Sequence, residues 1–241
     1  MSEHRNKFGQ PIGGPLPGWT PRPRPPRTPM EGRFCRVAPL DPARHGDDLF
    51  AAYCADPDGR IWTYMPAGPF PSESGFRDWL VERAALEDPL VFAILEAGTG
   101  RALGLASLMR IDPPSGVIEV GGIAFSPALQ RTPMATEAMY LMMRRAFAEL
   151  GYRRYEWKCD ALNAPSRAAA RRLGFRYEGT FRQAMVIKGR NRDTAWFSIT
   201  DGEWPAVQRA LERWLAPANF DARGQQRESL SRLTEPLSTP R

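Results

Sequence analysis

Apolar residues along the chain form short β-branched or aromatic runs separated by stretches with helical periodicity. The clearest run covers residues 117–125 (VIEVGGIAF), between Gly116 and Pro127. Its content of valine, isoleucine and phenylalanine predicts a strand. The Gly121-Gly122 pair interrupts the run, and glycine weakens a strand interior. The pair therefore predicts a β-bulge or the close approach of a ligand or another backbone, and an irregular sheet edge is the alternative.

A long helix is predicted directly after this strand, over residues 133–150. Thr132 is a suitable N-cap, Pro133 suits the first helical position, and Gly151 follows the last periodic residue. The amino end of a helix carries unpaired N–H groups and the positive end of the helix dipole, so it can bind phosphate oxygens. Because every helix has such an end, this feature alone does not identify a phosphate site.

The same criteria predict the remaining elements. Strands are expected at 34–40, 90–96, 101–109, 154–161, 176–187 and 193–200, and helices at 42–55, 74–86, 163–173 and 203–216. The helix before strand 154–161 forms a crossover that is compatible with parallel pairing to strand 117–125. Residues 1–31, rich in proline, glycine and arginine, are expected to be an extended segment. The folded domain should then cover 32–216, with a polar tail over 217–241.

Composition limits the class of protein. The 241 residues are 42% hydrophobic, which is typical of a globular protein and sufficient for a substantial core. Neither a signal-peptide core nor an apolar stretch of the roughly 20 residues needed to cross a bilayer is evident. The three cysteines, Cys35, Cys54 and Cys159, have neither paired nor metal-ligand spacing. We therefore expect a cytoplasmic protein without a membrane partner.

The net charge of +6 raises the question of nucleic-acid binding. Several arginines fall in the extended segment 1–31, however, and others lie on predicted helices. Solvated helix faces explain them better than a nucleic-acid surface does. The positive field would also favour an anionic cosubstrate.

Two motifs resemble one known family. Residues 130–135 (QRTPMA) resemble the Q/R-x-x-G-x-G/A pyrophosphate loop of the GCN5-related N-acetyltransferase (GNAT) superfamily. Asn163 and Ser166, followed by residues 173–175 (LGF), are similar to the N-x-x-S and L-G-F motifs of the branch that contains the ribosomal-protein serine and alanine N-acetyltransferases. The resemblance implies an α+β fold: a mixed, mostly antiparallel twisted sheet with flanking helices and a splayed central pair of parallel strands.

The resemblance also implies acetyl-CoA as cosubstrate and a set of residues that bind it. The loop departs from the family pattern at Pro133, where glycine is usual, and proline has no N–H to donate. The amides of Met134, Ala135 and Thr136 are expected to remain available, so the loop is altered rather than destroyed. The expected cofactor-binding residues are Ile123, Ala124, Phe125, Gln130, Arg131, Thr132, Met134, Ala135, Thr136 and Asn163.

Two residues match catalytic positions of the family. Glu119, on the central strand just before the glycine pair, matches the glutamate of the A-E-I-G pattern and would accept a proton from the amine, directly or through water. A solvent-facing strand residue is the alternative. Ser166 matches the proposed proton donor to the thiolate, although serine in a first helical turn often bonds to nearby backbone instead. A backbone N–H near Ile123 to Phe125 would stabilise the oxyanion.

Other side chains are assigned more loosely. Tyr64 and the neighbouring aromatic residues Trp62 and Phe70, with the hairpin turn at 187–193, are expected on the acceptor side. Neither His4, in the extended segment, nor His45, at the start of a helix, is a good catalytic candidate, and no metal site is expected.

The favoured hypothesis is an acetyl-CoA-dependent N-acetyltransferase that acts on a primary amine, either a protein amino terminus or a small-molecule amine. One alternative is a non-catalytic acyl-CoA-binding regulatory module, in which the altered loop still holds the cosubstrate. A basic nucleic-acid-binding protein is a third hypothesis. The sequence is compatible with a homodimer but does not determine the oligomeric state or the acceptor.

Overall fold

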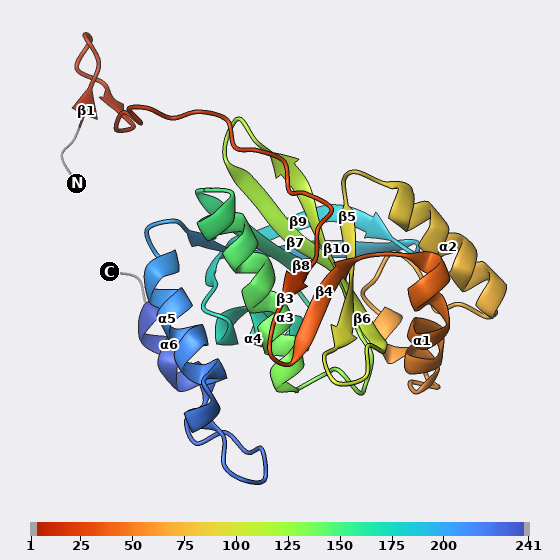
Figure 1. Ribbon diagram of the computed structural model, residues 1–241. Helices are drawn as coiled ribbons and strands as arrows, with labels where there is room; N and C mark the ends of the chain where they lie inside the picture. Colours follow the sequence, from red (N-terminus) through yellow and green to blue (C-terminus); the bar gives the residue numbers. More distant parts are fainter. Residues whose placement is uncertain (1–3, 239–241) are drawn as a thin grey trace.

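A computed structural model describes residues 4–238 and shows an eight-stranded mixed sheet with helices on both faces (Figure 1). The strand order is β3-β4-β5-β6-β7-β8-β10-β9, and only β7 and β8 are parallel neighbours. The strands are β3 (Met30–Glu31), β4 (Cys35–Pro39), β5 (Leu90–Glu96), β6 (Ala102–Asp112), β7 (Val117–Phe125), β8 (Arg154–Asp160), β9 (Arg176–Ile187) and β10 (Arg190–Thr200). The expected mixed, mostly antiparallel α+β sheet is confirmed.

Five of the six α-helices described agree with the sequence prediction, and α6 (Leu230–Ser238) was not expected. The five are α1 (Pro42–Cys54), α2 (Glu73–Ala85), α3 (Pro133–Arg144), α4 (Ala164–Arg172) and α5 (Trp204–Leu215), with a short turn η1 (Arg60–Trp62). The predicted helix 133–150 begins as expected, but its last part is the π-helical segment η2 (Arg145–Glu149).

The sheet separates two hydrophobic cores. Along β5 every residue from Leu90 to Leu95 is buried, and alternate side chains enter opposite cores. Phe92 and Ile94 pack in the core that includes α3 and α5, whereas Val91 and Leu95 pack in the core that includes α1 and α2. A strand covered on both faces needs apolar side chains in both directions, which explains the uninterrupted apolar run there.

The β9–β10 hairpin has a tighter turn than expected. Arg190 pairs with Ile187, so the turn contains only Lys188 and Gly189, and both have positive φ. The Lys188 ammonium donates a 2.9 Å hydrogen bond to the carbonyl of Trp62 in η1. The tip of the hairpin is therefore anchored to the η1 loop.

The amino-terminal segment is extended, as expected, and part of it lies along the domain. Strands β1 (His4–Arg5) and β2 (Pro11–Ile12) form a small hairpin that projects from the body in Figure 1. Further along, Trp19 donates a 2.9 Å hydrogen bond from its indole to the carbonyl of Pro114. Buried Arg145 contacts Thr28 Oγ1 at 3.0 Å. Residues 1–3 lie outside the described part of the chain.

Residues 217–238 differ from the expected polar tail. They contain the 3-10 turn η3 (Pro217–Asn219) and helix α6, which packs against α4 and α5. The reason is an apolar face with helical spacing: Leu230 is fully buried, and Leu233 and Leu237 pack against the same core. The last residues of the expected tail, 239–241, lie outside the described part.

Membrane-spanning helices are not found among the described residues, since none of their helices combines the length and hydropathy that crossing a bilayer requires.

Candidate active site

The parallel strands β7 and β8 are paired over only part of their length. Their register begins with Val117 opposite Arg154 and ends with Val120 opposite Trp157. Beyond this point β7 continues to Phe125 and β8 to the end of its own span, and within residues 4–238 no strand lies between them. The predicted splayed pair is present, and it opens a space at the centre of the sheet.

A bulge at Gly121-Gly122 lies where the strands separate. Gly122 has a φ of 57°, and the register of β7 with β6 is irregular there. A Cβ atom added to Gly121 would lie 2.4 Å from the sulfur of Met109 and 3.3 Å from Oε1 of Glu119. The predicted bulge is confirmed, and glycine is favoured there because a side chain at 121 would collide with Met109 and lie close to the carboxylate of Glu119.

A cavity of about 270 Å³ adjoins this bulge. Its walls come from β7, the end of β8, the start of α4, the η1 loop and the β9–β10 hairpin. Glu119, Ile123, Asn163 and Ser166 all line it. The structure therefore gathers both expected catalytic residues, and two of the expected cofactor-binding residues, around one cavity.

Glu119 lies in the cavity wall with its side chain only 4% exposed. Its Oε2 atom contacts the ammonium of Lys158 at 2.8 Å and Nη1 of Arg110 at 2.7 Å. Arg110 has a φ of 47°, and its backbone amide donates a 2.9 Å hydrogen bond to Asp88, which fixes this irregular part of β6. Glu119 is therefore a buried ion-paired carboxylate and not the solvent-facing strand residue of the alternative interpretation.

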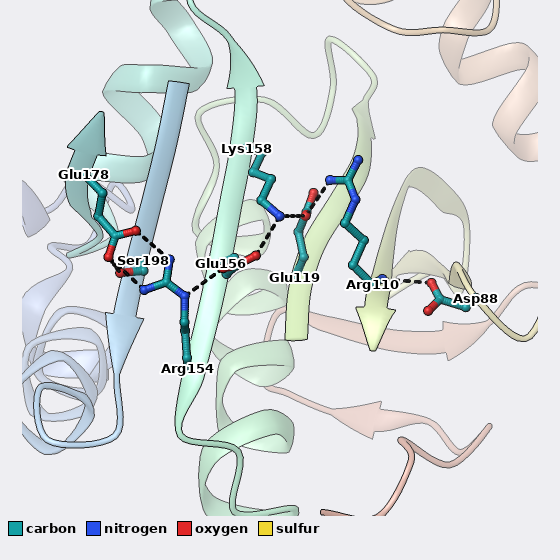
Figure 2. Close-up of polar contacts among 8 residues, drawn as sticks. All are labelled: Asp88, Arg110, Glu119, Arg154, Glu156, Lys158, Glu178 and Ser198. Atoms are coloured by element: carbon teal, nitrogen blue, oxygen red, sulfur yellow. Dashed lines mark hydrogen bonds and ion pairs between the residues drawn. The ribbon is translucent and has the colours of Figure 1, made fainter. Parts of the chain in front are cut away.

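Polar contacts continue from Glu119 to residues of three further strands, β8, β9 and β10 (Figure 2). Lys158 contacts Oε2 of Glu156 at 2.7 Å, and Arg154 contacts Oε1 of Glu156 at 2.7 Å. Arg154 also pairs with Glu178 on β9, which accepts a hydrogen bond from Ser198 on β10. The hydrogen bond from Arg154 lowers the pKa of Glu178, so the Glu178 carboxyl remains ionised at neutral pH.

Ser166 is held at the start of α4 by two contacts. The side chain of Asn163 caps the helix by accepting a 3.1 Å hydrogen bond from the amide of Ser166. The indole N–H of Trp157 donates to Ser166 Oγ at 3.0 Å. The hydroxyl oxygen accepts in that contact, so its proton is directed to another neighbour beside the cavity, where the sulfur of Cys159 lies.

Cys159 also lines the cavity, close to Ser166. Burial raises the pKa of its thiol, and a hydrogen bond with Ser166 offsets this only in part. The thiolate is the nucleophilic form of cysteine. A thiol with a raised pKa is a poor nucleophile at neutral pH, so Cys159 is not suited to form a covalent intermediate.

The loop before α3 presents unpaired backbone donors. The amides of Arg131, Thr132 and Met134 have no hydrogen-bond partner within residues 4–238. Arg131 has a φ of 60°, and successive N–H groups near a left-handed residue form a concave anion-binding arrangement. With the helix amino terminus behind them, these donors fit a pyrophosphate group.

Two of the three expected loop amides are already engaged. Thr132 Oγ1 accepts a 3.1 Å hydrogen bond from the amide of Ala135, and the amide of Thr136 makes a long 3.5 Å contact with the Thr132 carbonyl. The expectation for these two amides was wrong because the N-cap side chain and carbonyl satisfy them. Of the three, only the amide of Met134 is unpaired.

Other expected cofactor-binding residues have partners inside the protein. The carbonyl of Ala124 accepts a 2.9 Å hydrogen bond from the Tyr53 hydroxyl. Gln130 donates a 2.8 Å hydrogen bond to the carbonyl of Phe125. The hydroxyl of Thr136 is buried and accepts a 3.0 Å hydrogen bond from Arg172. The side chains of Gln130 and Thr136 therefore support the loop and helix in this structure.

The expected acceptor-side residues fall into two groups. Tyr64 and Ile187 line the cavity. Trp62 is only 4% exposed and makes edge-on ring contacts with Tyr53 and Phe70, in the core beneath α1 and α2. Trp62 and Phe70 therefore support the η1 loop instead of lining the cavity beside Glu119.

Lys158 and Arg110 are site residues that the sequence analysis missed. In strand 154–160 charged residues occupy alternate positions, at Arg154, Glu156 and Lys158. Alternate strand residues share a face, so this pattern could have predicted a charged row next to Glu119. The position of Arg110 depends on its left-handed backbone, for which the sequence carries no signal.

Comparison with known proteins agrees with this geometry. A family profile described as acetyltransferase (GNAT) domain matches residues 38–176, more than half of the chain. The crystal structure of a GCN5-related N-acetyltransferase from Brucella melitensis superposes with a TM-score of 0.89 and 50% identity, covering 91% of this chain and 100% of that one.

Two curated relatives point the same way. The uncharacterized N-acetyltransferase p20 of Bacillus licheniformis is 28% identical over 160 residues, which are 65% of this chain and 88% of that protein. The putative ribosomal N-acetyltransferase YdaF of Bacillus subtilis is 26% identical over 150 residues, 59% of this chain and 78% of that protein. On the profile match, the two motifs and the splayed strands, the chain belongs to the GNAT family of N-acetyltransferases.

Proposed function

We propose that the protein transfers the acetyl group of acetyl-CoA to a primary amine by direct attack of the amine on the thioester. The cavity beside the separated strands supports this proposal most strongly, because it brings Glu119 of β7 and Ser166 of α4 to the walls of one space. Bound acetyl-CoA would supply the activated acetyl group. The unpaired amides of Arg131, Thr132 and Met134 would hold its pyrophosphate.

Glu119 is the proposed base. An α-amine with a pKa of about 7.8 is roughly a tenth neutral at pH 7, and a lysine-type amine with a pKa of about 10.4 is about 0.04% neutral. A base that removes a proton from the amine therefore assists either acceptor. Since both ionic contacts of Glu119 use Oε2, Oε1 would accept that proton.

Ser166 is the proposed acid. In the overall exchange, a C–N bond forms and the C–S bond breaks, the amine proton passes to Glu119, and the thiolate receives a proton from Ser166. The proton held by Glu119 then returns through solvent to the oxygen of Ser166, which restores both groups. The hydrogen bond from Trp157 fixes the oxygen of Ser166 and leaves its proton available. A backbone amide of β7 near Ile123 would stabilise the oxyanion.

The acceptor is proposed to be a protein amino terminus or a small amine of similar size. The name of the YdaF relative, a putative ribosomal N-acetyltransferase, supports the first. Tyr64 and Met185 line the cavity and would contact the first residues of such a peptide.

Replacing Glu119 tests the assignment. Glu119→Gln should lower kcat by about 10²-fold or more, as expected for loss of a general base, and leave the Kd of acetyl-CoA within a few-fold. Calorimetry would give the Kd, and thiol release with serine- and alanine-initiated peptides, putrescine and glycine would give kcat. An unchanged kcat would remove Glu119 from the mechanism.

The wild-type protein separates the competing hypotheses in the same assays. Acetyl-CoA binding without thiol release on the whole panel would favour the non-catalytic binding module. Salt-sensitive RNA binding without acetyl-CoA binding would favour the nucleic-acid hypothesis.

A further inference from the structure

Lys158 occupies an unusual place in the site. Its side chain is only 6% exposed, and its ammonium lies between two carboxylates, 2.8 Å from Glu119 and 2.7 Å from Glu156. It also lies 3.7 Å from the centroid of the Trp196 ring. Lysine is rarely buried unless it is paired, so this arrangement requires a reason.

The sheet register supplies the first part of that reason. Glu119 and Glu156 are direct register partners on parallel strands, and their side chains are only 4% and 8% exposed. Two carboxylates placed in this way repel each other, and one of them tends to keep a proton. Lys158 follows Glu156 by two residues, so it lies on the same face and its charge reaches both.

The separation of the strands supplies the second part. The pairing of β7 with β8 ends one residue before Lys158, opposite Val120. The ammonium therefore contacts Oε2 of Glu119 at the edge of the cavity, and glycine at 121 places no Cβ atom against Oε1. Both cations contact Oε2 of Glu119, and Oε1 has no ionic partner within residues 4–238.

Arg110 is a weaker partner than Lys158. It contacts the same Oε2 atom at 2.7 Å, but its side chain is 47% exposed, so water and salt screen the contact. Arg154, on the far side, balances Glu156. Four other titratable residues line the same cavity, and none of them forms an ion pair with Glu119 within residues 4–238: Arg83 of α2, Arg192 of β10, and Cys159 and Asp160 of β8. Lys158 is thus the buried cation between the two carboxylates.

We propose that Lys158 is a positioning residue for the transfer reaction, which offsets the charge of Glu156 beside Glu119 and orients Glu119 so that Oε1 can accept the proton of the acceptor amine. This inference rests on the proposed role of Glu119 as base. Glu156 supports this role, because its carboxylate balances the charge of Lys158 and holds the ammonium between the strands. A purely structural Lys158 would neutralise the two carboxylates without influencing how the rate depends on pH.

The test compares pH profiles of kcat among Lys158→Met, Glu156→Gln and the double variant. Lys158→Met leaves two facing carboxylates, so Glu119 should be protonated more readily and the acidic limb should move up by about one pH unit. In the double variant the carboxylate of Glu156 is removed as well, so the acidic limb should return towards its wild-type pH. The acceptor is the most active of a serine-initiated peptide, an alanine-initiated peptide, putrescine and glycine. The ionisation of the acceptor amine affects all variants equally, so the comparison uses only the differences between their pH profiles of kcat.

The profiles give distinct outcomes. The proposal is supported if the acidic limb of the kcat profile moves to higher pH in Lys158→Met. The double variant should reverse this movement, and the movement should be absent when Lys158→Met is combined with Glu119→Gln. A loss of kcat that is equal at every pH, with a lower Tm, makes Lys158 structural and overturns it, as does an unchanged profile. If Glu119→Gln alone keeps full activity, the base assignment fails and this inference fails with it. A strong loss in Glu119→Gln combined with an unshifted Lys158→Met profile overturns only the role of Lys158.

Discussion

Each proposed reacting side chain has one atom held and another available. Glu119 uses Oε2 for its two cations, and Ser166 uses its oxygen to accept from the Trp157 indole. In both cases the partner lies on β6 or β8, next to the cavity. Orientation by such neighbours is what a proton-transfer group needs, because it removes competing rotamers before the substrate arrives.

Ser166→Ala should lower kcat by about 10²-fold, because the thiolate loses its proposed proton donor. The Kd of acetyl-CoA should change little, since the amide of Ser166 and its cap by Asn163 remain. Trp157→Phe is the comparison: it keeps the hydroxyl and removes only the indole donor, so its loss should be smaller. Steady-state thiol release and calorimetry measure both constants, and an unchanged kcat in Ser166→Ala would contradict the assignment.

At the level of the element, the start of α3 combines a good helix cap with unpaired donors. Thr132 accepts from the amide of Ala135 and donates a 2.7 Å hydrogen bond to the carbonyl of Leu129. Pro133 begins the helix with a fixed φ and has no N–H that would need a partner. The departure from the family's glycine at 133 is therefore compatible with a well-formed helix, and the donors come from Arg131, Thr132 and Met134.

Thr132→Asp should weaken acetyl-CoA binding by at least about tenfold, because it places a negative charge beside the proposed pyrophosphate site. Aspartate and asparagine are both good N-caps, so neither substitution should disturb the helix. Thr132→Asn is thus the matched neutral control and should bind nearly as well as the wild type. Calorimetric titration at two ionic strengths measures the effect, and equal affinities for the two variants would show that the phosphates bind elsewhere.

At the level of the whole molecule, periodicity and turn residues predicted nearly every strand and helix of the sheet. The strand at 117–125 and the helix start at Pro133 were predictable because glycine and proline mark their limits locally. Helix α6 was missed because few apolar residues stand in a polar stretch. The pairing of Glu119 with Lys158 and Arg110 could not be predicted as a contact, since it depends on strand order and on an irregular backbone.

Part of the amino-terminal segment is packed against the domain, and we expect these contacts to stabilise the fold. Residues 19–31 contact the β6–β7 turn through Trp19, and they also contact η2 and the residues that follow it. Tyr152 donates a 3.1 Å hydrogen bond to the carbonyl of Pro23, and buried Arg145 donates to Thr28 and to the carbonyl of Pro29. Met30 is only 2% exposed and pairs with β4. An arginine left buried without these partners costs about 1–3 kcal/mol.

Two truncations separate this contribution from that of the projecting hairpin. Removing residues 1–31 exposes the surface under Met30 and leaves Arg145 without its partners in the segment, so several kcal/mol should be lost and Tm should fall by about 10 °C. Removing only residues 1–18 keeps every one of those contacts and should change Tm by no more than about 2 °C. Calorimetric melting of both proteins measures the difference. Equal Tm values for the two truncations would mean that residues 19–31 do not stabilise the domain, and that their hydrogen bonds to Arg145 and Tyr152 only replace water.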